Sequence, residues 1–272
     1  MTLIMGIVNA TPDSFSDGGR YLDPVDAVAH GRALAAAGAD ILDVGGESTR
    51  PGAERVPAAV ETARVLPVIE ELAATGTMIS VDTLNATTAA AAIAAGALIV
   101  NDVSGGLADP EILEVVADTE AHIALGHWRG PSTEMYARAQ YDDVVEEVVA
   151  ELAERRHEAM AAGIPPDRII LDPGFGFGKR GRQNLDLLRG IERIIALGSR
   201  VLVGTSRKGF LAEALEEVGG EATAHRRDLA TAVTSLRAAD AGVWGVRVHD
   251  VAATRDALAV WELARGTAER ER

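Results

Sequence analysis

Three polar residues stand where short, mainly apolar runs of the chain stop. They are Asp82, Asn101 and Asp172. Their carboxylate and amide oxygens can accept hydrogen bonds from the N–H groups of a flat nitrogen heterocycle. The same oxygens also suit Mg²⁺. Any one of them could be a helix cap, but three at matching positions indicate a site, so a heterocycle site and a metal site both stay open.

A second candidate cluster is cationic. Arg247 and His249 lie two residues apart in RVHD (247–250), so they point to the same side of an extended segment. An arginine and a histidinium on one side suit a phosphate or pyrophosphate group. The alternative for His249 alone is a buried structural histidine.

Two polar, glycine-containing segments follow the first two apolar runs. NATPDSFSDGG (9–19) begins with Asn9, whose amide oxygen can bind a hard cation, and carries Phe15 and Asp17. A phenylalanine among polar residues has little structural reason to be there, which favours a functional loop. GGESTRPG (45–52) supplies hydroxyls and Arg50, so it predicts either an anion cradle or a simple turn.

Two further motifs add rings and cations. In DPGFGFGK (172–179) the glycines allow close backbone approach, and Phe175 or Phe177 could stack on a flat ring. Lys179, at its end, is expected in solvent. Of Arg207 and Lys208 in GTSRKG (204–209), we expect one to reach the site and the other to pair with an acid.

The sequence shows no histidine-rich metal cluster and no nucleophile–base motif. His127, in GHWRG (126–130), ends another apolar run but has no such partner nearby in the sequence. The predicted site therefore holds and polarises its substrates without a covalent intermediate.

Eight short runs must position these residues. They read as buried parallel strands, each followed by a helical pattern, and they span 3–8, 41–44, 78–81, 98–100, 122–125, 169–171, 201–203 and 246–248. Polar residues follow nearly every run, which favours a closed barrel over an open doubly wound sheet. The chain is predicted to be an α/β protein, a single-domain (β/α)8 TIM barrel with its site at the strand exits.

Composition limits the alternatives. In a chain of 272 residues, 47% hydrophobic, we expect one domain over 1–264 and a charged, frayed tail over 265–272. The net charge of −15 opposes nucleic acid and anionic membranes as partners, and no run approaches the roughly 20 apolar residues of a membrane helix. The sequence has no cysteine and its start does not resemble a signal peptide, so a cytoplasmic location is expected.

Taken together and in order, seven motifs between Met5 and Val251 resemble the dihydropteroate synthase family of pterin-binding TIM-barrel enzymes. They are NATPDSFSDGG, GGESTRPG, SVDT (80–83), NDVSGG (101–106), DPGFGFGK, TSRK (205–208) and RVHDV (247–251). The GHWRG segment is most similar to actinobacterial members.

The resemblance implies a reaction of folate biosynthesis. A 6-hydroxymethyl-7,8-dihydropterin pyrophosphate would condense with p-aminobenzoate to 7,8-dihydropteroate and pyrophosphate. Pyrophosphate would leave first, and the aniline nitrogen would then attack. Mg²⁺ is the implied cofactor, the substrates are the implied small-molecule partners, and a homodimer is the implied assembly.

It also implies roles for individual residues. The pterin would contact Asp82, Asn101, Asp172 and Lys208; the pyrophosphate would contact Asn9, Arg247 and His249, with Asn9 also at the metal. The p-aminobenzoate pocket would comprise Phe15, Thr49, Arg50, Pro51, Phe177 and the backbone of Gly209. The implied catalytic residues are Asp17 and Arg50, which would pair when the loops close over the substrates, and Lys208.

Two positions depart from the family pattern. Gly126 replaces a common methionine before the fifth-strand histidine, which predicts a roomier pocket floor, and Gly209 replaces a common serine that helps to hold the aminobenzoate carboxylate. They leave open a paralogue that binds pterin without this activity. A methyltetrahydrofolate-binding methyltransferase domain would share the barrel but would not need the 9–19, SRK or RVHD segments.

Overall fold

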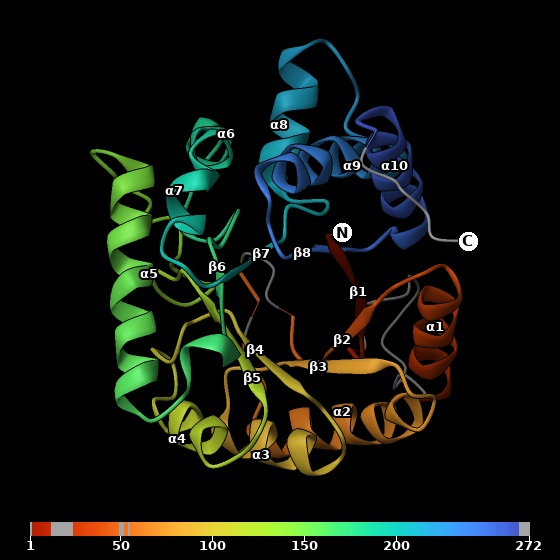
Figure 1. The fold of residues 1–272 in the computed structure, drawn as a ribbon, viewed down its shortest axis with the longest axis vertical. Coiled ribbons are helices and arrows are strands. Elements are labelled where there is room, and N and C mark those ends of the chain that lie inside the picture. The colour runs from red at the N-terminus through yellow and green to blue at the C-terminus, as the bar shows by residue number, and fades with distance from the viewer. Residues whose placement is uncertain (1, 12–23, 49–51, 54, 267–272) are drawn as a thin grey trace.

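Eight parallel strands close into a barrel in the order of the sequence (Figure 1). The computed structural model describes residues 2–11, 24–48, 52–53 and 55–266. The strands are β1 Leu3–Asn9, β2 Ile41–Gly45, β3 Met78–Asp82, β4 Ile99–Asp102, β5 His122–Gly126, β6 Ile169–Asp172, β7 Arg200–Val203 and β8 Gly245–Val248. Since β1 pairs with both β2 and β8, the sheet has no free edge and the predicted TIM barrel is confirmed.

Helices surround the barrel and cover its outer face (Figure 1). They are α1 Pro24–Ala36, α2 Ala58–Ala73, α3 Ala86–Ala94, α4 Glu111–Ala117, α5 Val144–Ala161, α6 Arg182–Arg189, α7 Ile191–Ile195, α8 Gly209–Glu217, α9 Ala224–Ala241 and α10 Val251–Ala264, with a 3₁₀ turn at Pro166–Arg168. The expected domain limit at residue 264 coincides with the end of α10, and residues 267–272 of the expected tail lie outside the described residues.

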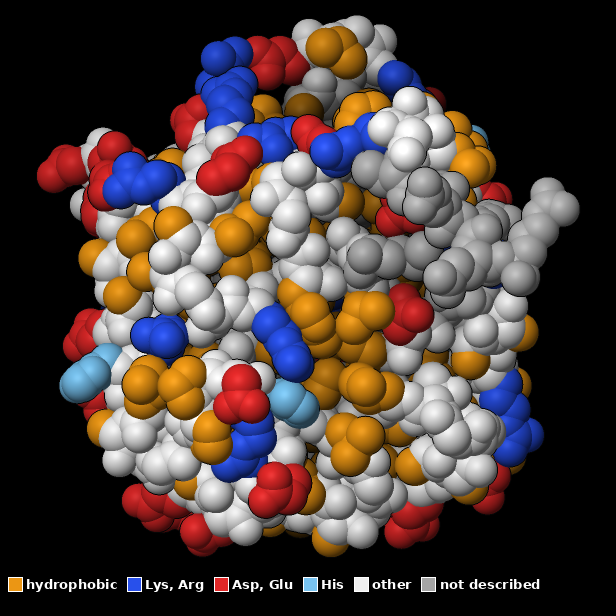
Figure 2. Space-filling model, viewed as in Figure 1, with side chains coloured by type: hydrophobic (Ala, Val, Ile, Leu, Met, Phe, Trp, Pro, Cys, Tyr) orange, Lys and Arg blue, Asp and Glu red, His pale blue; other side chains and the backbone are white. Residues whose placement is uncertain are grey.

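Local sequence explains where these helices form. The Asp143 carboxylate caps α5 by accepting the N–H groups of Val145 and Glu146, and Val148 and Leu152 bury one stripe of that helix. None of the helices in the described ranges is long and apolar enough to cross a membrane. On the face seen in Figure 2, many acidic side chains lie around the edge, over the outer helices.

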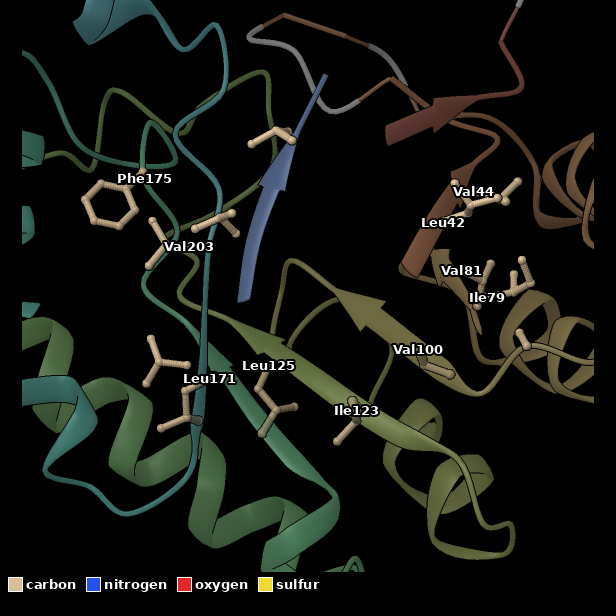
Figure 3. Close-up of a cluster of buried hydrophobic side chains, with 14 of the residues drawn as sticks. Leu42, Val44, Ile79, Val81, Val100, Ile123, Leu125, Leu171, Phe175 and Val203 are labelled. Atoms are coloured by element: carbon tan, nitrogen blue, oxygen red, sulfur yellow. The ribbon is translucent and has the colours of Figure 1, made fainter. Parts of the chain in front are cut away.

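Strand alternation divides the core into two layers. Leu42, Val44 and Val81 belong to a large cluster between strands and helices (Figure 3). The opposite face of the strands supplies a smaller apolar cluster inside the barrel, made of Met5, Ile41, Ile99, Ala124, Ile170 and Leu202. Successive side chains point to opposite faces of a strand. The residues two positions after those of the inner cluster therefore also face the barrel interior.

Candidate active site

A polar layer lies inside the barrel, on the carboxyl-terminal side of the inner apolar cluster. Three members come two residues after an apolar residue of that cluster, Arg247 is opposite Met5 in register, and Asp82 is opposite Asn101. Its members are Asp43 on β2, Asp82 on β3, Asn101 on β4, Asp172 on β6 and Arg247 on β8. The three predicted polar residues and the predicted arginine thus share one rim.

Arg247 lies at the centre of this layer. Its Nε lies 2.6 Å from Oδ2 of Asp43, and its Nη2 lies 2.8 Å from Oδ2 of Asp82. Burial alone would lower the pKa of the guanidinium, but the adjacent carboxylates of Asp43 and Asp82 raise it above its ordinary value. Arg247 therefore stays charged and holds two acids in fixed positions.

Asp43 was missed by the sequence reasoning. It lies within the run 41–44, which predicts only a buried strand, and its one signal is an acid between Leu42 and Val44. The Asp43 side chain is fully buried, and its Oδ2 also accepts a hydrogen bond from Nδ2 of Asn101 at 3.0 Å.

Two acceptor atoms in this layer are buried without a partner. They are Oδ1 of Asp43 and Oδ1 of Asn101. A buried acceptor that stays unpaired costs about 1–3 kcal/mol, so such atoms call for a ligand or water that donates. The layer therefore has more hydrogen-bond acceptors than donors. A heterocycle with several N–H groups would supply the missing donors.

Burial disfavours the ionised forms of Asp82 and Asp172. Burial raises the pKa of Asp82 to about 7, an effect that Arg247 opposes and Asp43 reinforces. Burial also raises the pKa of Asp172, opposed by the N–H of Gly174 and by the cations Lys208 and Arg247. Donors from a ligand would favour the ionised forms.

As expected, one of the two neighbouring cations Arg207 and Lys208 pairs with an acid and the other reaches the site. Arg207 pairs with Asp228, with Nε 2.6 Å from Oδ1 and Nη2 2.8 Å from Oδ2. Lys208 turns inward, and its Nζ lies 3.8 Å from the ring centre of Phe177. Burial lowers the pKa of Lys208 to about 8, while Asp172 acts in the opposite direction.

His249 differs from the cation that was expected. The Oγ of Ser206 accepts the backbone N–H of His249 at 3.1 Å and lies 2.9 Å from Nδ1 of its ring. With the Ser206 hydroxyl donating to Nδ1, the neutral ring carries its N–H at Nε2. Burial lowers the pKa of His249 to about 3, so at neutral pH His249 is an uncharged donor.

One cavity of about 710 Å³ opens over this layer. Its lining includes Asn9, Asp82, Phe177, Lys208, Arg247 and His249, together with Gly209. The cavity therefore brings together predicted residues from five strand exits. Within the described ranges no group of three His, Cys, Asp or Glu side chains could hold a metal ion.

The structure decides two expectations from the DPGFGFGK motif: which phenylalanine can face a ligand, and where Lys179 lies. Phe175 is fully buried and packs on Phe210, with ring centres 6.3 Å apart, so only Phe177 can face a ligand. Lys179 is 1% exposed, and the expectation that it lies in solvent is wrong. Its Nζ instead bonds to backbone carbonyls of its own loop and to His127.

The two family departures have different consequences. A Cβ at Gly126 would lie 2.4 Å from the carbonyl oxygen of Val103, so neighbouring backbone fills the space and the expected roomier floor is wrong. A Cβ at Gly209 would meet no atom within 4 Å. The remaining predicted residues, Phe15, Asp17, Thr49, Arg50 and Pro51, lie outside the described residues.

A closed parallel barrel with buried acceptors, an inward arginine and a neutral histidine at its carboxyl end defines a class of enzyme. It is a TIM-barrel enzyme that binds a polar heterocycle next to an anion. The chain matches the pterin binding enzyme family model over residues 5–249, and it belongs to that family.

Known proteins support this membership. The chain is 51% identical over 259 residues to the dihydropteroate synthase of Mycobacterium leprae, covering 94% of this chain and 91% of that protein. It superposes with a TM-score of 0.89 and 47% identity on Xanthomonas albilineans dihydropteroate synthase with 4-aminobenzoic acid, covering 97% and 93% of the two chains. A structure of the enzyme from the same organism in complex with 7,8-dihydropteroate superposes with a TM-score of 0.85 and 44% sequence identity. The match covers 97% of this chain and 94% of that chain.

Proposed function

We propose that this chain condenses 6-hydroxymethyl-7,8-dihydropterin pyrophosphate with p-aminobenzoate, forming 7,8-dihydropteroate and pyrophosphate. The observation that carries the proposal is the pair of unpartnered buried acceptors on Asp43 and Asn101. They belong to the same polar layer as Asp82 and Arg247, which line the cavity. The family membership and the 51% identity to a dihydropteroate synthase support the same activity.

The pterin would lie on the polar layer. Asp82, Asn101 and Asp172 would accept from its N–H groups, and Lys208 would donate to a ring acceptor. Nζ of Lys208 lies over the ring of Phe177. From there it can reach the ring of a bound pterin. Support comes from the burial of Asp82 and Asn101 and from the donor shortage of the layer.

The pyrophosphate would bind at the end of β8, beside Arg247 and His249. Arg247 and the Nε2–H of His249 would donate to its oxygens, and Asn9 would hold Mg²⁺ together with the phosphates. One side-chain oxygen from the protein fits Mg²⁺, since this ion usually keeps water and takes its other ligands from the substrate. When bound, the ion would supply positive charge that makes pyrophosphate a better leaving group.

The second substrate would bind between Phe177 and the N–H of Gly209. Phe15, Thr49, Arg50 and Pro51 are proposed to complete this pocket, with Asp17 pairing to Arg50 when the loops close. Closure would exclude water from the reacting carbon.

The reaction then needs no protein nucleophile. The methylene C–O bond breaks and its electron pair leaves with pyrophosphate, so that positive charge spreads from the methylene carbon into the pterin ring. The carboxylates of the layer favour that charge. The aniline nitrogen attacks the carbon, forms the C–N bond, and loses a proton to water.

An assay of pyrophosphate release tests the proposal. It uses the pterin pyrophosphate, p-aminobenzoate and Mg²⁺, with a control that lacks p-aminobenzoate. Release that depends on both substrates is the expected result. Absence of release, with tight binding of the bare pterin, would instead favour the pterin-binding paralogue. That alternative is supported by the departures at Gly126 and Gly209, and the filled space beside Gly126 removes the first of them.

We also propose a homodimer and a cytoplasmic location, as the resemblance implies. Helices α9 and α10 pack together and expose Leu229, Val233, Val260 and Leu263. Such apolar side chains on neighbouring helices suit a subunit contact. Light scattering coupled to gel filtration tests the dimer, and Val233→Glu should give monomers.

A further inference from the structure

Lys179 is a buried lysine that the proposed chemistry does not use. Its side chain is 1% exposed, and its Nζ lies 2.9 Å from the carbonyl oxygen of Gly174 and 3.0 Å from that of Phe177. The third neighbour of Nζ is Nδ1 of His127, at 2.9 Å. Burying an ammonium group is costly, so a lysine with this set of contacts needs a reason.

The two carbonyls belong to a turn that carries two substrate contacts. The N–H of Gly174 donates to Oδ1 of Asp172 at 2.7 Å, and the N–H of Phe177 closes the turn on the carbonyl of Gly174. Gly174 and Gly176 adopt left-handed φ values of 66° and 75°. Glycines in such a turn have much freedom to lose, so its shape depends on groups that anchor it.

A second side chain anchors the same turn without charge. Asn184 is fully buried, and its Oδ1 accepts the N–H of Gly176 at 2.7 Å. Lys179 and Asn184 therefore hold opposite polar groups of one turn, the first by donating and the second by accepting.

Lys179 and Asp172 also influence each other electrostatically. Burial lowers the pKa of Lys179 well below its ordinary value, and Asp172 is the charged group that most raises it. The other charged groups acting on Lys179 are Lys208, Arg129 and Glu151; those acting on Asp172 are Lys208, Arg247 and Lys179.

On its far side Lys179 is joined to the barrel wall. Nε2 of His127 lies 2.9 Å from Oε2 of Glu151 on α5. Glu151 also pairs with Arg129. The turn is thus connected through Lys179 and His127 to a rigid helix.

We propose that Lys179 is a positioning residue: its Nζ holds the turn at residues 174–177, so that Gly174 keeps its N–H on Asp172, which meets the pterin, and Phe177 meets the second substrate. The proposal rests on the proposed function for those two contacts. It assigns Lys179 no contact with either substrate.

The test compares Lys179→Met with Asn184→Ala. Both variants remove an anchor of the turn: the first removes the donor to two of its carbonyls, and the second removes the acceptor for the N–H of Gly176. Two quantities are measured: the KM for p-aminobenzoate, and the pH at which the Asp172 carboxyl titrates, followed by carbon-13 NMR. Melting curves confirm that each variant is folded, and Lys179→Gln replaces the methionine variant if that one does not fold.

We expect both variants to raise the KM by about tenfold, as the loss of one or two hydrogen bonds predicts, with a smaller change in kcat. Both variants should also raise the pH at which Asp172 titrates, because a loosened turn weakens the N–H bond from Gly174 that favours the carboxylate. An unchanged Asp172 titration in Lys179→Met, or an unchanged KM, would overturn the proposal.

The readouts separate this idea from the proposed function. If the unaltered protein binds no pterin and releases no pyrophosphate, the proposed function fails. The NMR titration of Asp172 still decides whether Lys179 acts on that carboxyl, because it requires no substrate.

Discussion

Arg247 and Asp43 meet inside the barrel, from the two strands that flank β1. The 2.6 Å contact between Nε and Oδ2 fixes the arginine from one side, while Asp82 fixes it from the other. Asp43 is also the acceptor for Asn101. One buried acid therefore links the proposed pyrophosphate contact to the proposed pterin contact.

Substitution Asp43→Asn should lower kcat/KM by about 10- to 100-fold. A hydrogen bond to a charged group is worth about 1.5–3 kcal/mol, and about 1.4 kcal/mol corresponds to a factor of ten. Steady-state kinetics with both substrates measures the change. Asp26→Asn, on the exposed side of α1, is the matched control and should have no effect; a similar loss in both variants would remove the role of Asp43.

Pterin affinity should rise as the pH rises through about 7. The pKa of Asp82 in the free protein is raised from 3.8 to about 7, so below that pH the side chain is largely protonated and accepts poorly. Calorimetry with the bare pterin between pH 5.5 and 8.5 measures the trend, and Asp82→Asn should flatten it.

The raised pKa of Asp82 should also make the protein less stable as the pH rises, whereas pterin affinity should increase. Because folding raises the pKa of Asp82, the stabilising contribution of this group is complete below about pH 4 and is lost as the pH rises to about 7. Chemical denaturation of Asp82→Asn should therefore show a weaker decline in unfolding free energy over that interval than the unaltered protein. An identical decline would mean that other groups cause it.

Ser206→Ala should weaken pyrophosphate binding by about three- to tenfold. Without the Ser206 hydroxyl, Nδ1 of His249 can take the proton, and the fraction of rings with N–H at Nε2 falls; a lost neutral hydrogen bond is worth about 0.5–1.5 kcal/mol. Product inhibition by pyrophosphate measures the affinity, and nitrogen-15 NMR reports the tautomer. Ser206→Thr keeps the hydroxyl and should stay near the unaltered values, whereas a tautomer unaffected by Ser206→Ala would contradict the assignment.

Gly209→Ser should lower the KM for p-aminobenzoate without loss of stability. The position has open space for a Cβ, and a serine hydroxyl there can donate to the carboxylate. We expect up to about a tenfold lower KM, the value of one good hydrogen bond. An unchanged KM would indicate that the carboxylate lies elsewhere.

Gly126→Ala is the contrasting glycine variant. Its Cβ would lie 2.4 Å from the carbonyl oxygen of Val103 and 2.5 Å from its Cα, which are backbone atoms that cannot turn away. We expect a loss of unfolding free energy of about 1–3 kcal/mol, measured by urea denaturation. A variant as stable as the unaltered protein would show that the Val103 backbone can shift.

The sequence by itself determined the barrel and most of its rim. Eight runs with helical patterns between them predict a closed parallel sheet, because apolar strands of that length need helices on their outer face. Asp82, Asn101, Asp172 and Arg247 followed from that prediction, since residues at the exits of parallel strands share one end.

Tertiary structure decided what each of those side chains does. Asp43 looked like part of an apolar strand, and only barrel closure placed it against Arg247. Lys179 looked solvated, and only the fold buried it beneath its own loop. His249 looked like a cation, but burial and the hydroxyl of Ser206 keep it neutral. Charge state and hydrogen-bond partners depend on neighbours distant in the chain, and periodicity along a sequence carries no record of them.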